Sequence, residues 1–176
     1  MILPLAYYGD AVLRKKALPV EVFDDDLRKF IEDMEETRAS TKALGIAAPQ
    51  VHRSIRVFVV NIPSKDSNEE YQPGTTRIFI NPKILEISEE KWMAQEGCLS
   101  IPKLYEDVER PLRVKVEAQD PYGKTFVQEF KSWEAKVILH ENDHINGVLF
   151  IDRIHGKKRK MLESFLNEIK RKYSKF

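Results

Sequence analysis

The sequence predicts an α+β fold, in which mixed or antiparallel sheets pack around a central helix and an amphipathic helix ends the chain. Segments rich in β-branched and aromatic residues lie in the middle of the chain, where strands are expected. Helical signals occur near both ends and in one segment after residue 132. The length of 176 residues suits one domain with a sizeable core.

Two helices are predicted in the N-terminal part of the chain. Residues 10–16 fit a short helix that stops before Pro19, and a longer helix starts where Asp24 or Asp25 can cap it. This second helix continues to about Ser40. Its core-facing residues recur at helical spacing and are Leu27, Phe30, Ile31 and Met34.

The predicted strands are short and are separated by turn residues. A small-residue connector covers 43–50, an exposed polar loop covers 63–76, and Pro82 is expected to separate two strands. The last two strands before the central helix alternate in polarity and predict a hairpin. The expected strands cover 55–60, 77–81, 84–88, 113–119, 125–130 and 148–151.

The composition excludes several classes of protein. A single cysteine cannot form an internal disulfide and fits a reducing compartment. The N-terminus lacks a basic segment and meets Pro4, Gly9 and Asp10 too early for a signal peptide. No apolar run approaches membrane-spanning length. We therefore expect a soluble cytoplasmic protein with no membrane or DNA partner.

The segment from His140 to His144 reads His-Glu-Asn-Asp-His, an HExxH pattern. On an α-helix, residues four apart lie one turn apart on nearly the same face, so both imidazoles can bind one metal ion. Glu141 projects about 100° further round the helix and can hold a water at that ion. Ser132 can cap this helix and Gly147 can end it. The pattern therefore predicts a metal site.

A catalytic metal site needs a third protein ligand and one open position. The only cysteine, Cys98, lies in the sequence Glu-Gly-Cys-Leu-Ser. A lone cysteine is commonly a small buried hydrophobic residue, but beside a two-histidine helix its thiolate is a strong ligand for a divalent metal. Gly97 lets the backbone approach a metal or a ligand closely. The predicted ligands are therefore Cys98, His140 and His144.

These motifs resemble those of the peptide deformylase family. That family carries GxGxAAxQ, EGCLS and QHExDH in this order, and this chain has ALGIAAPQ ending at Gln50, a complete EGCLS, and LHENDH. Ala43 stands where the family usually has glycine, and Leu139 stands where it usually has glutamine. The resemblance covers residues 43–147 in motifs and also fits the length and the C-terminal tail.

The resemblance implies hydrolysis of the N-formyl group on the N-terminal formyl-methionine of a new polypeptide, with release of formate. It implies that Glu141 carries the proton between water and the leaving amine. It further implies that Gln50 and the backbone N–H of Leu99 stabilise the tetrahedral oxyanion. Read from the residues alone, the connector that holds Gln50 could instead be a tight connection packed against a helix.

The metal ion itself is inferred from the family rather than from the ligands. The resemblance implies Fe²⁺ in the cell, whereas a Cys-His-His donor set alone favours zinc. A preparation could also carry Zn²⁺, Ni²⁺ or Co²⁺. Matching family positions further suggest that Glu96 pairs with Arg110 behind the metal ligands.

The substrate contacts are expected on both sides of the metal. Leu44, Gly45 and Gly97 match family positions at which the backbone binds an extended peptide. Trp133 and Val137 lie on the same face of the motif helix as the first histidine, so they are candidates to line an apolar pocket for the methionine side chain. Either residue could instead belong to the core.

The tail differs in charge from the rest of the chain. Residues 155–176 contain eight Lys or Arg and two Glu, a balance of +6, which leaves −5 on residues 1–154. We expect 1–154 to be a catalytic metallohydrolase domain and 155–176 to be its basic C-terminal helix. Either this helix is merely solvated, or it contacts a polyanion such as ribosomal RNA. Its apolar stripe is Met161, Leu162, Phe165, Leu166 and Ile169.

Two other functions are compatible with parts of the sequence. An HExxH metalloprotease would take its third ligand downstream, from His155, Glu163 or Glu168, and would leave Cys98 without a role. A non-catalytic ribosome- or RNA-associated protein would leave both metal motifs unexplained. His52 has no partner motif and, like His155, is expected on the surface.

Overall fold

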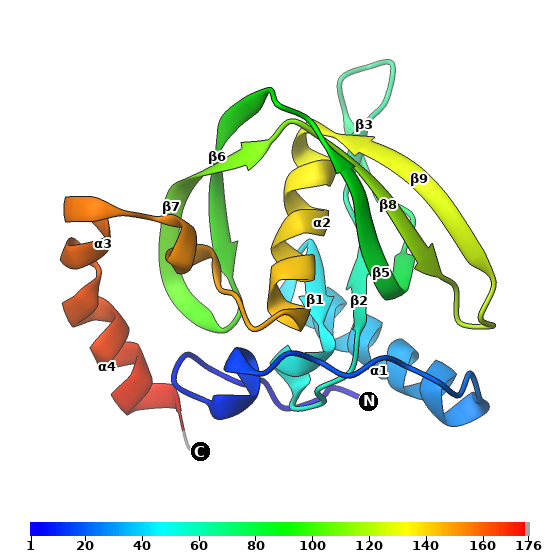
Figure 1. The fold of residues 1–176 in the computed structure, drawn as a ribbon, viewed down its shortest axis with the longest axis horizontal. Helices are drawn as coiled ribbons and strands as arrows, with labels where there is room; N and C mark the ends of the chain where they lie inside the picture. The colour runs from blue at the N-terminus through cyan, green and yellow to red at the C-terminus, as the bar shows by residue number, and fades with distance from the viewer. Residues whose placement is uncertain (175–176) are drawn as a thin grey trace.

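The computed structural model describes residues 1–174 and has the predicted α+β architecture (Figure 1). Its strands are β1 (Gly45–Ala47), β2 (Val57–Val60), β3 (Ser64–Lys65), β4 (Tyr71–Gln72), β5 (Arg77–Ile87), β6 (Lys91–Cys98), β7 (Ile101–Pro111), β8 (Arg113–Gln119) and β9 (Thr125–Lys131). The largest sheet is antiparallel, with strand order β1-β2-β5-β8-β9. The pairs β3–β4 and β6–β7 form two further antiparallel hairpins.

The helices lie at the ends of the chain and between the sheets. They are α1 (Asp25–Thr41), α2 (Ser132–Ile145), α3 (Gly156–Met161) and α4 (Glu163–Tyr173), with 3-10 turns η1 (Ala11–Arg14), η2 (Ala48–Val51) and η3 (Phe150–Arg153). The predicted cap of α1 is confirmed, because the Asp24 carboxylate accepts a hydrogen bond from the Leu27 amide (2.9 Å). No helix among residues 1–174 is both long and apolar enough to span a bilayer.

Strand β2 is buried on both faces because α1 and α2 cover opposite sides of the large sheet. Val57 and Val59 belong to the apolar cluster that α1 completes. Phe58 and Val60 point the other way into the cluster beneath α2, where the Phe58 ring stacks on Phe79 with centroids 4.8 Å apart. The continuous apolar run of this strand follows from its burial between two helices.

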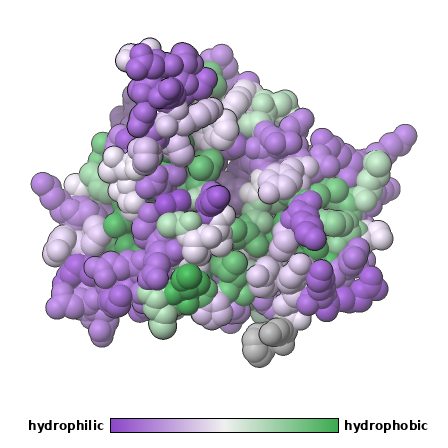
Figure 2. All heavy atoms as spheres, turned by 180° about the vertical axis from the view of Figure 1, so that it is seen from behind, coloured by the Kyte–Doolittle hydropathy of each residue, from purple (hydrophilic) through white to green (hydrophobic). Residues whose placement is uncertain are grey.

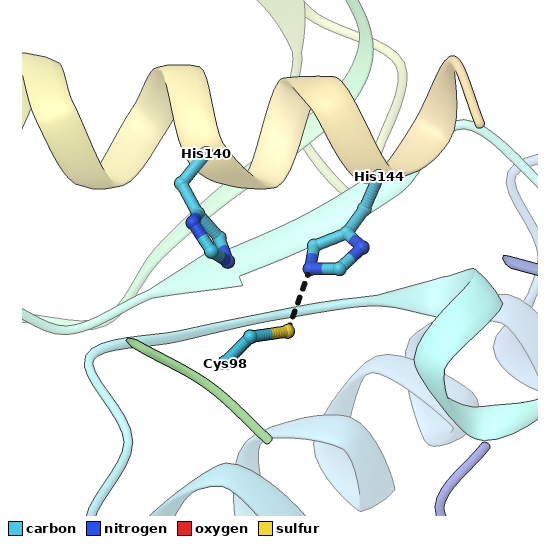
Figure 3. A group of neighbouring side chains, drawn as sticks. All are labelled: Cys98, His140 and His144. Carbon is cyan, nitrogen blue, oxygen red and sulfur yellow. Dashed lines mark hydrogen bonds between the residues drawn. The ribbon is translucent and has the colours of Figure 1, made fainter. Parts of the chain in front are cut away.

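Helix α2 is enclosed between the large sheet and the β6–β7 hairpin (Figure 1). Ile138 lies in the core cluster under the sheet, and the Ile145 side chain is also fully buried there. His140 and His144 face the end of β6 instead (Figure 3). The helix that carries the HExxH motif is therefore also a main component of the core.

The β6–β7 hairpin has no counterpart among the predicted strands. Its inward positions are occupied by Ala94, Glu96, Val108 and Arg110, all of them buried. Two of these four side chains are charged, so the apolar alternation that marks a half-buried strand is absent from the sequence. The two strands were not predicted from the sequence because charged side chains occupy part of the inside of the hairpin.

The prediction that Pro82 separates two strands is wrong, because β5 continues through it. The pairing of β5 with β8 shifts between Ile80 and Lys83, so that the extra residue is accommodated as a bulge. Asn81 adopts a positive φ of 50° there. Its side chain exchanges two hydrogen bonds with the Val20 backbone (2.8 and 2.9 Å), which fastens the N-terminal segment to the sheet.

Other local predictions need smaller corrections. The segment 148–151, expected as a strand, enters the turn η3, in which Asp152 accepts a hydrogen bond from the Leu149 amide (2.9 Å). Ser132 is not the cap of α2, since Lys131 takes that position and makes no side-chain cap. The connector 43–50 contains β1 and the start of η2, and the predicted loop 63–76 contains the exposed β3–β4 hairpin.

The basic tail forms two short helices, α3 and α4, where one was predicted. Its apolar side faces inward as expected, because Leu162, Leu166 and Ile169 are buried in a cluster with η3 and β7. Met161 is the exception at 80% exposed. Lys175 and Phe176 of the predicted tail lie outside the described residues. The tail is thus docked on the rest of the molecule.

Candidate active site

The three predicted metal ligands converge on one point. His140 and His144 project from successive turns of α2 toward Cys98, which ends β6 (Figure 3). One ligand atom from each of the three lies within 4.8 Å of the others. The Cys98 Sγ is 3.3 Å from Nε2 of His144. Both histidines are buried and the cysteine is half-buried, so these donors are held in place rather than mobile.

The donor set fits a divalent metal by chemistry as well as by position. A thiolate and two imidazoles are ligands that zinc and iron accept, and a fourth position would remain for water or substrate. Nδ1 of His140 donates to Oε1 of Glu96 (2.7 Å), which leaves Nε2 of that ring for the cluster. Burial lowers the pKa of His144 well below its ordinary value, which favours the neutral ring that binds a metal.

Behind the ligands lies a buried ion-pair network, as the sequence predicted for Glu96 and Arg110. Arg110 donates twice to Glu96 (2.7 and 2.8 Å) and once to Asp143 (2.8 Å). Arg153 adds two hydrogen bonds to Asp143 from the other side (both 2.7 Å). Burial alone would raise the pKa of Glu96, but hydrogen bonds from Arg110 and His140 outweigh it and lower that pKa to about 2.

Glu141 lies beside the cluster and is almost completely buried. Its Oε2 has no hydrogen-bond partner among the described residues, so a polar atom is available toward the cleft. Burial, together with the nearby carboxylates, raises the pKa of Glu141 to about 7 against the opposing charge of His140. A carboxylate with a pKa close to neutral is suited to accept and return a proton.

Strand β1 passes directly beside Glu141. A Cβ added at Gly45 would come 2.8 Å from both Cγ and Oε1 of Glu141, so only glycine allows this approach. The alanine at position 43 causes no backbone strain, since positive φ occurs one residue earlier, at Lys42 (59°). The departure from the family motif at Ala43 is therefore compatible with the same close passage of β1.

The Gln50 side chain is oriented by its two ends. Its Oε1 accepts a hydrogen bond from the Ala47 amide (2.9 Å), so its Nε2 must point the other way. Nε2 donates to Oγ of Ser100 (3.2 Å) and lies 3.5 Å from Sγ of Cys98. Ser100 was not singled out from the sequence, although it ends the EGCLS motif. The amide of Gln50 therefore faces the metal-ligand cluster.

Gln50, Cys98, His140 and Glu141 line a cleft of about 710 Å³. In the view from behind, the surface is hollowed in the region that α2 and β6 occupy in Figure 1, with hydrophilic residues on part of the rim (Figure 2). Trp133 is half exposed (51%) and is not a core residue, whereas Val137 is buried and also touches the cleft. All the predicted substrate contacts line it, namely Leu44, Gly45, Gly97, Trp133 and Val137, as does Leu99.

The remaining histidines and the alternative ligands considered from the sequence lie outside the metal-ligand cluster. His52 and His155 are exposed, as expected. Within residues 1–174, Cys98, His140 and His144 form the one cluster of potential metal ligands. The downstream residues that a metalloprotease would need, His155, Glu163 and Glu168, take no part in it.

A cysteine on β6 that meets two histidines on α2, with the buried Glu141 beside them on that helix, is the arrangement of a metal-dependent hydrolase. Residues 2–160 match the family profile described as polypeptide deformylase. The chain belongs to the peptide deformylase family.

Individual relatives agree over nearly the whole chain. A peptide deformylase of Helicobacter hepaticus is 41% identical over 169 residues, covering 96% of this chain and 92% of the relative. The crystal structure of peptide deformylase from Thermotoga maritima shares 42% identity with a TM-score of 0.79, over 89% of this chain and 99% of that one. That of Plasmodium falciparum shares 35% with a TM-score of 0.87, over 97% and 96%.

Removal of the buried guanidinium should destabilise the protein strongly. In Arg110→Met, Glu96 and Asp143 lose a buried partner, which costs about 3–5 kcal/mol of unfolding free energy. Urea denaturation at neutral pH measures this loss. Arg113→Met, which removes an exposed pair with Glu90, is the matched control and should change little.

The same network should give the protein an acid-sensitive stability. Because the pKa of Glu96 falls from an ordinary 4.5 to about 2 on folding, its contribution is present above pH 4.5 and is lost as the pH falls toward 2. This loss should be smaller in Arg110→Met. Equal acid sensitivity in the variant and the wild type, or a neutral-pH change no larger than that of Arg113→Met, would contradict the role assigned to Arg110.

Proposed function

We propose that this chain removes the N-formyl group from the N-terminal formyl-methionine of newly synthesised polypeptides and releases formate. Membership of the family supports the reaction, and the observation that carries it here is the buried Glu141 beside the Cys98, His140 and His144 cluster. Formate release from formyl-Met-Ala by the metal-loaded protein tests the proposal directly. Hydrolysis of internal peptide bonds without formate release would favour a protease instead.

Cys98, His140 and His144 are the residues that would hold the metal. When bound, a divalent ion polarises the formyl oxygen and lowers the pKa of a water molecule. We propose Fe²⁺ as the ion used in the cell, with Zn²⁺, Ni²⁺ or Co²⁺ as replacements in a preparation. Glu96 orients the His140 ring by accepting its Nδ1 proton, so the ligand is held before any metal binds.

Glu141 is proposed to move the proton. Its unpaired Oε2 takes a proton from the attacking water and then gives it to the amine nitrogen as the C–N bond breaks. The proton is thus accepted first by the buried carboxylate and then by the leaving nitrogen. The pKa near 7 lets one group both accept and donate without a large penalty in either direction.

Gln50 and Leu99 are proposed to stabilise the tetrahedral oxyanion. The fixed Gln50 amide directs its N–H donors toward the cluster because Ala47 holds the oxygen end. The backbone N–H of Leu99 would supply a second donor beside Cys98. Donors that are held in place before the reaction need no reorganisation as charge develops.

The remaining substrate contacts follow from the cleft. Val137 and Trp133 are proposed to line the pocket for the methionine side chain, with Val137 buried at its inner part. Leu44, Gly45 and Gly97 are proposed to bind the peptide backbone in an extended form. A Cβ at Gly97 would press on the Tyr105 ring (2.5 Å), so a side chain there would disturb the cleft wall.

We further propose that residues 1–154 form the catalytic unit and that the basic tail 155–176 brings it to the ribosome, where formylated chains emerge in the cytoplasm. The tail has its apolar side docked, which leaves most of its described basic residues exposed. Two of them form ion pairs, Lys158 with Glu106 (2.9 Å) and Arg159 with Glu163 (2.8 Å). The outward cations include Lys170, Arg171 and Lys172.

Glu141→Ala should retain metal but lose turnover by roughly 10²- to 10⁴-fold, because the proton carrier is removed while all three ligands remain. Formate release and metal content are measured on the same preparation. Glu134→Ala, an acidic residue on the same helix outside the main cleft, is the control and should keep activity. Wild-type turnover in Glu141→Ala would rule out the role as base.

Cys98→Ser should bind metal much more weakly, because a hydroxyl is a poor ligand at neutral pH compared with a thiolate. Metal content after dialysis against a chelator measures the change, with the wild-type protein dialysed in parallel. A variant that keeps stoichiometric metal through this treatment would show that Cys98 is not a ligand.

Charge reversal of Lys170, Arg171 and Lys172 to Glu should weaken co-sedimentation with ribosomes at low salt, because phosphate contacts release counterions. Truncation is a poorer test, since Leu166 is fully buried and its loss would expose the core. A matched reversal at exposed Lys15, Lys16 and Lys124 controls for net charge. Sedimentation equal to wild type would mean that the tail is only a solvated helix.

A further inference from the structure

Three lysines from separate elements line the cleft. Lys42 follows the last turn of α1, Lys103 lies in β7, and Lys136 lies on α2 four residues before His140. Lys136 therefore shares a helix face with the metal ligand. Its ammonium group donates to the Gln95 carbonyl (2.7 Å) and lies 4.7 Å from the centre of the Trp133 ring.

Within the described part of the chain, none of these lysines forms an ion pair, although the charge of Glu96 acts on Lys136. The cleft contains two carboxylates, Glu96 and Glu141, and both are buried. Glu96 is already paired with Arg110, and Glu141 faces the metal-ligand cluster. Among the described residues that line the cleft, the charged side chains left without an ion pair at its rim are therefore lysines.

The backbone at two of these positions is itself unusual. Lys42 and Lys103 have φ values of 59° and 65°, a region that glycine and asparagine occupy at lower cost than lysine. At Lys42 this conformation is the left-handed cap with which α1 ends, and Lys103 adopts it within β7. Both positions place a cationic side chain on the wall of the cleft.

The positive rim is a local property. Residues 1–154 carry a net charge of −5 and the whole chain +1, so the overall charge gives an anionic peptide little attraction. An acidic preference, if found, must come from the cleft itself. At moderate salt such contacts act over about 10 Å, which restricts them to peptide residues near the mouth of the cleft.

We propose that Lys42, Lys103 and Lys136 make this cleft selective for peptides with an acidic side chain shortly after the formyl-methionine. This rests on the proposed function and names a substrate class for it. An extended peptide advances about 3.3 Å per residue, so the second and third residues after the methionine come within reach of the rim while the formyl group is at the metal ligands. The lysines bind and orient the substrate and do not take part in the chemistry.

The test compares formyl-Met-Ala-Asp-Ala-amide with formyl-Met-Ala-Asn-Ala-amide, which differ in charge and hardly in size. We expect kcat/KM to favour the aspartate peptide roughly two- to fivefold at low salt, as for partly exposed charge pairs. The ratio should approach one as salt rises. A peptide series with the aspartate moved one residue later locates the contact.

The variant Lys42→Asn/Lys103→Asn keeps a residue that tolerates positive φ and removes both charges. Its aspartate-to-asparagine ratio should fall toward one, and Lys136→Met should reduce the ratio independently. Lys16→Asn removes an exposed lysine outside the cleft and should keep the wild-type ratio. The ratio, rather than the rate, is compared, so partial loss of activity does not obscure the result.

Equal kcat/KM for the two amidated peptides in the wild type overturns the proposal, as does a preference that survives in the lysine variants. A gain seen with a free C-terminal carboxylate but not with the aspartate amide would also overturn it, because the rim would then bind chain ends. Absence of formate from every peptide would instead contradict the proposed function.

Discussion

The structure depends on one buried guanidinium. Arg110 is 2% exposed and joins Glu96 on β6 to Asp143 on α2, so the hairpin and the motif helix are held together by charge. Removal of one member of a buried ion pair leaves the other charge buried without compensation, so loss of any one of these groups should destabilise the protein. Because Glu96 also fixes the His140 ring, the same contact sets the orientation of a metal ligand. The same ion-pair network therefore connects two elements of the fold and orients a residue of the site.

The candidate site could be predicted largely because its information is local. The spacing of His140 and His144 determines their common face once a helix is assumed, and Glu141 and Cys98 are marked by short motifs. The β6–β7 hairpin could not be predicted from the same sequence, because Glu96 and Arg110 occupy inward positions where a strand pattern requires apolar residues. Glu96 and Arg110, which form the ion pair behind the metal ligands, are thus also the residues that removed the strand pattern from the sequence of the hairpin.

Other differences arise from contacts between distant parts of the chain. Pro82 reads as a break, yet the strand continues through a bulge in its pairing with β8, where Asn81 bonds to the Val20 backbone from another segment. Lys42 and Lys103 look like ordinary surface residues along the chain, and only the folded arrangement brings them to one cleft. Periodicity and turn chemistry contain no information on such pairings, since both describe neighbours in sequence.

The close approach of Gly45 to Glu141 bears on two properties of the proposed site, turnover and metal binding. The three atoms nearest to a methyl group at this position would all belong to Glu141, at 2.8 to 3.0 Å. A side chain at position 45 would therefore first displace the proposed proton carrier rather than a proposed metal ligand. On the proposed roles, a substitution of this glycine would lower turnover while leaving the three proposed metal ligands in the sequence.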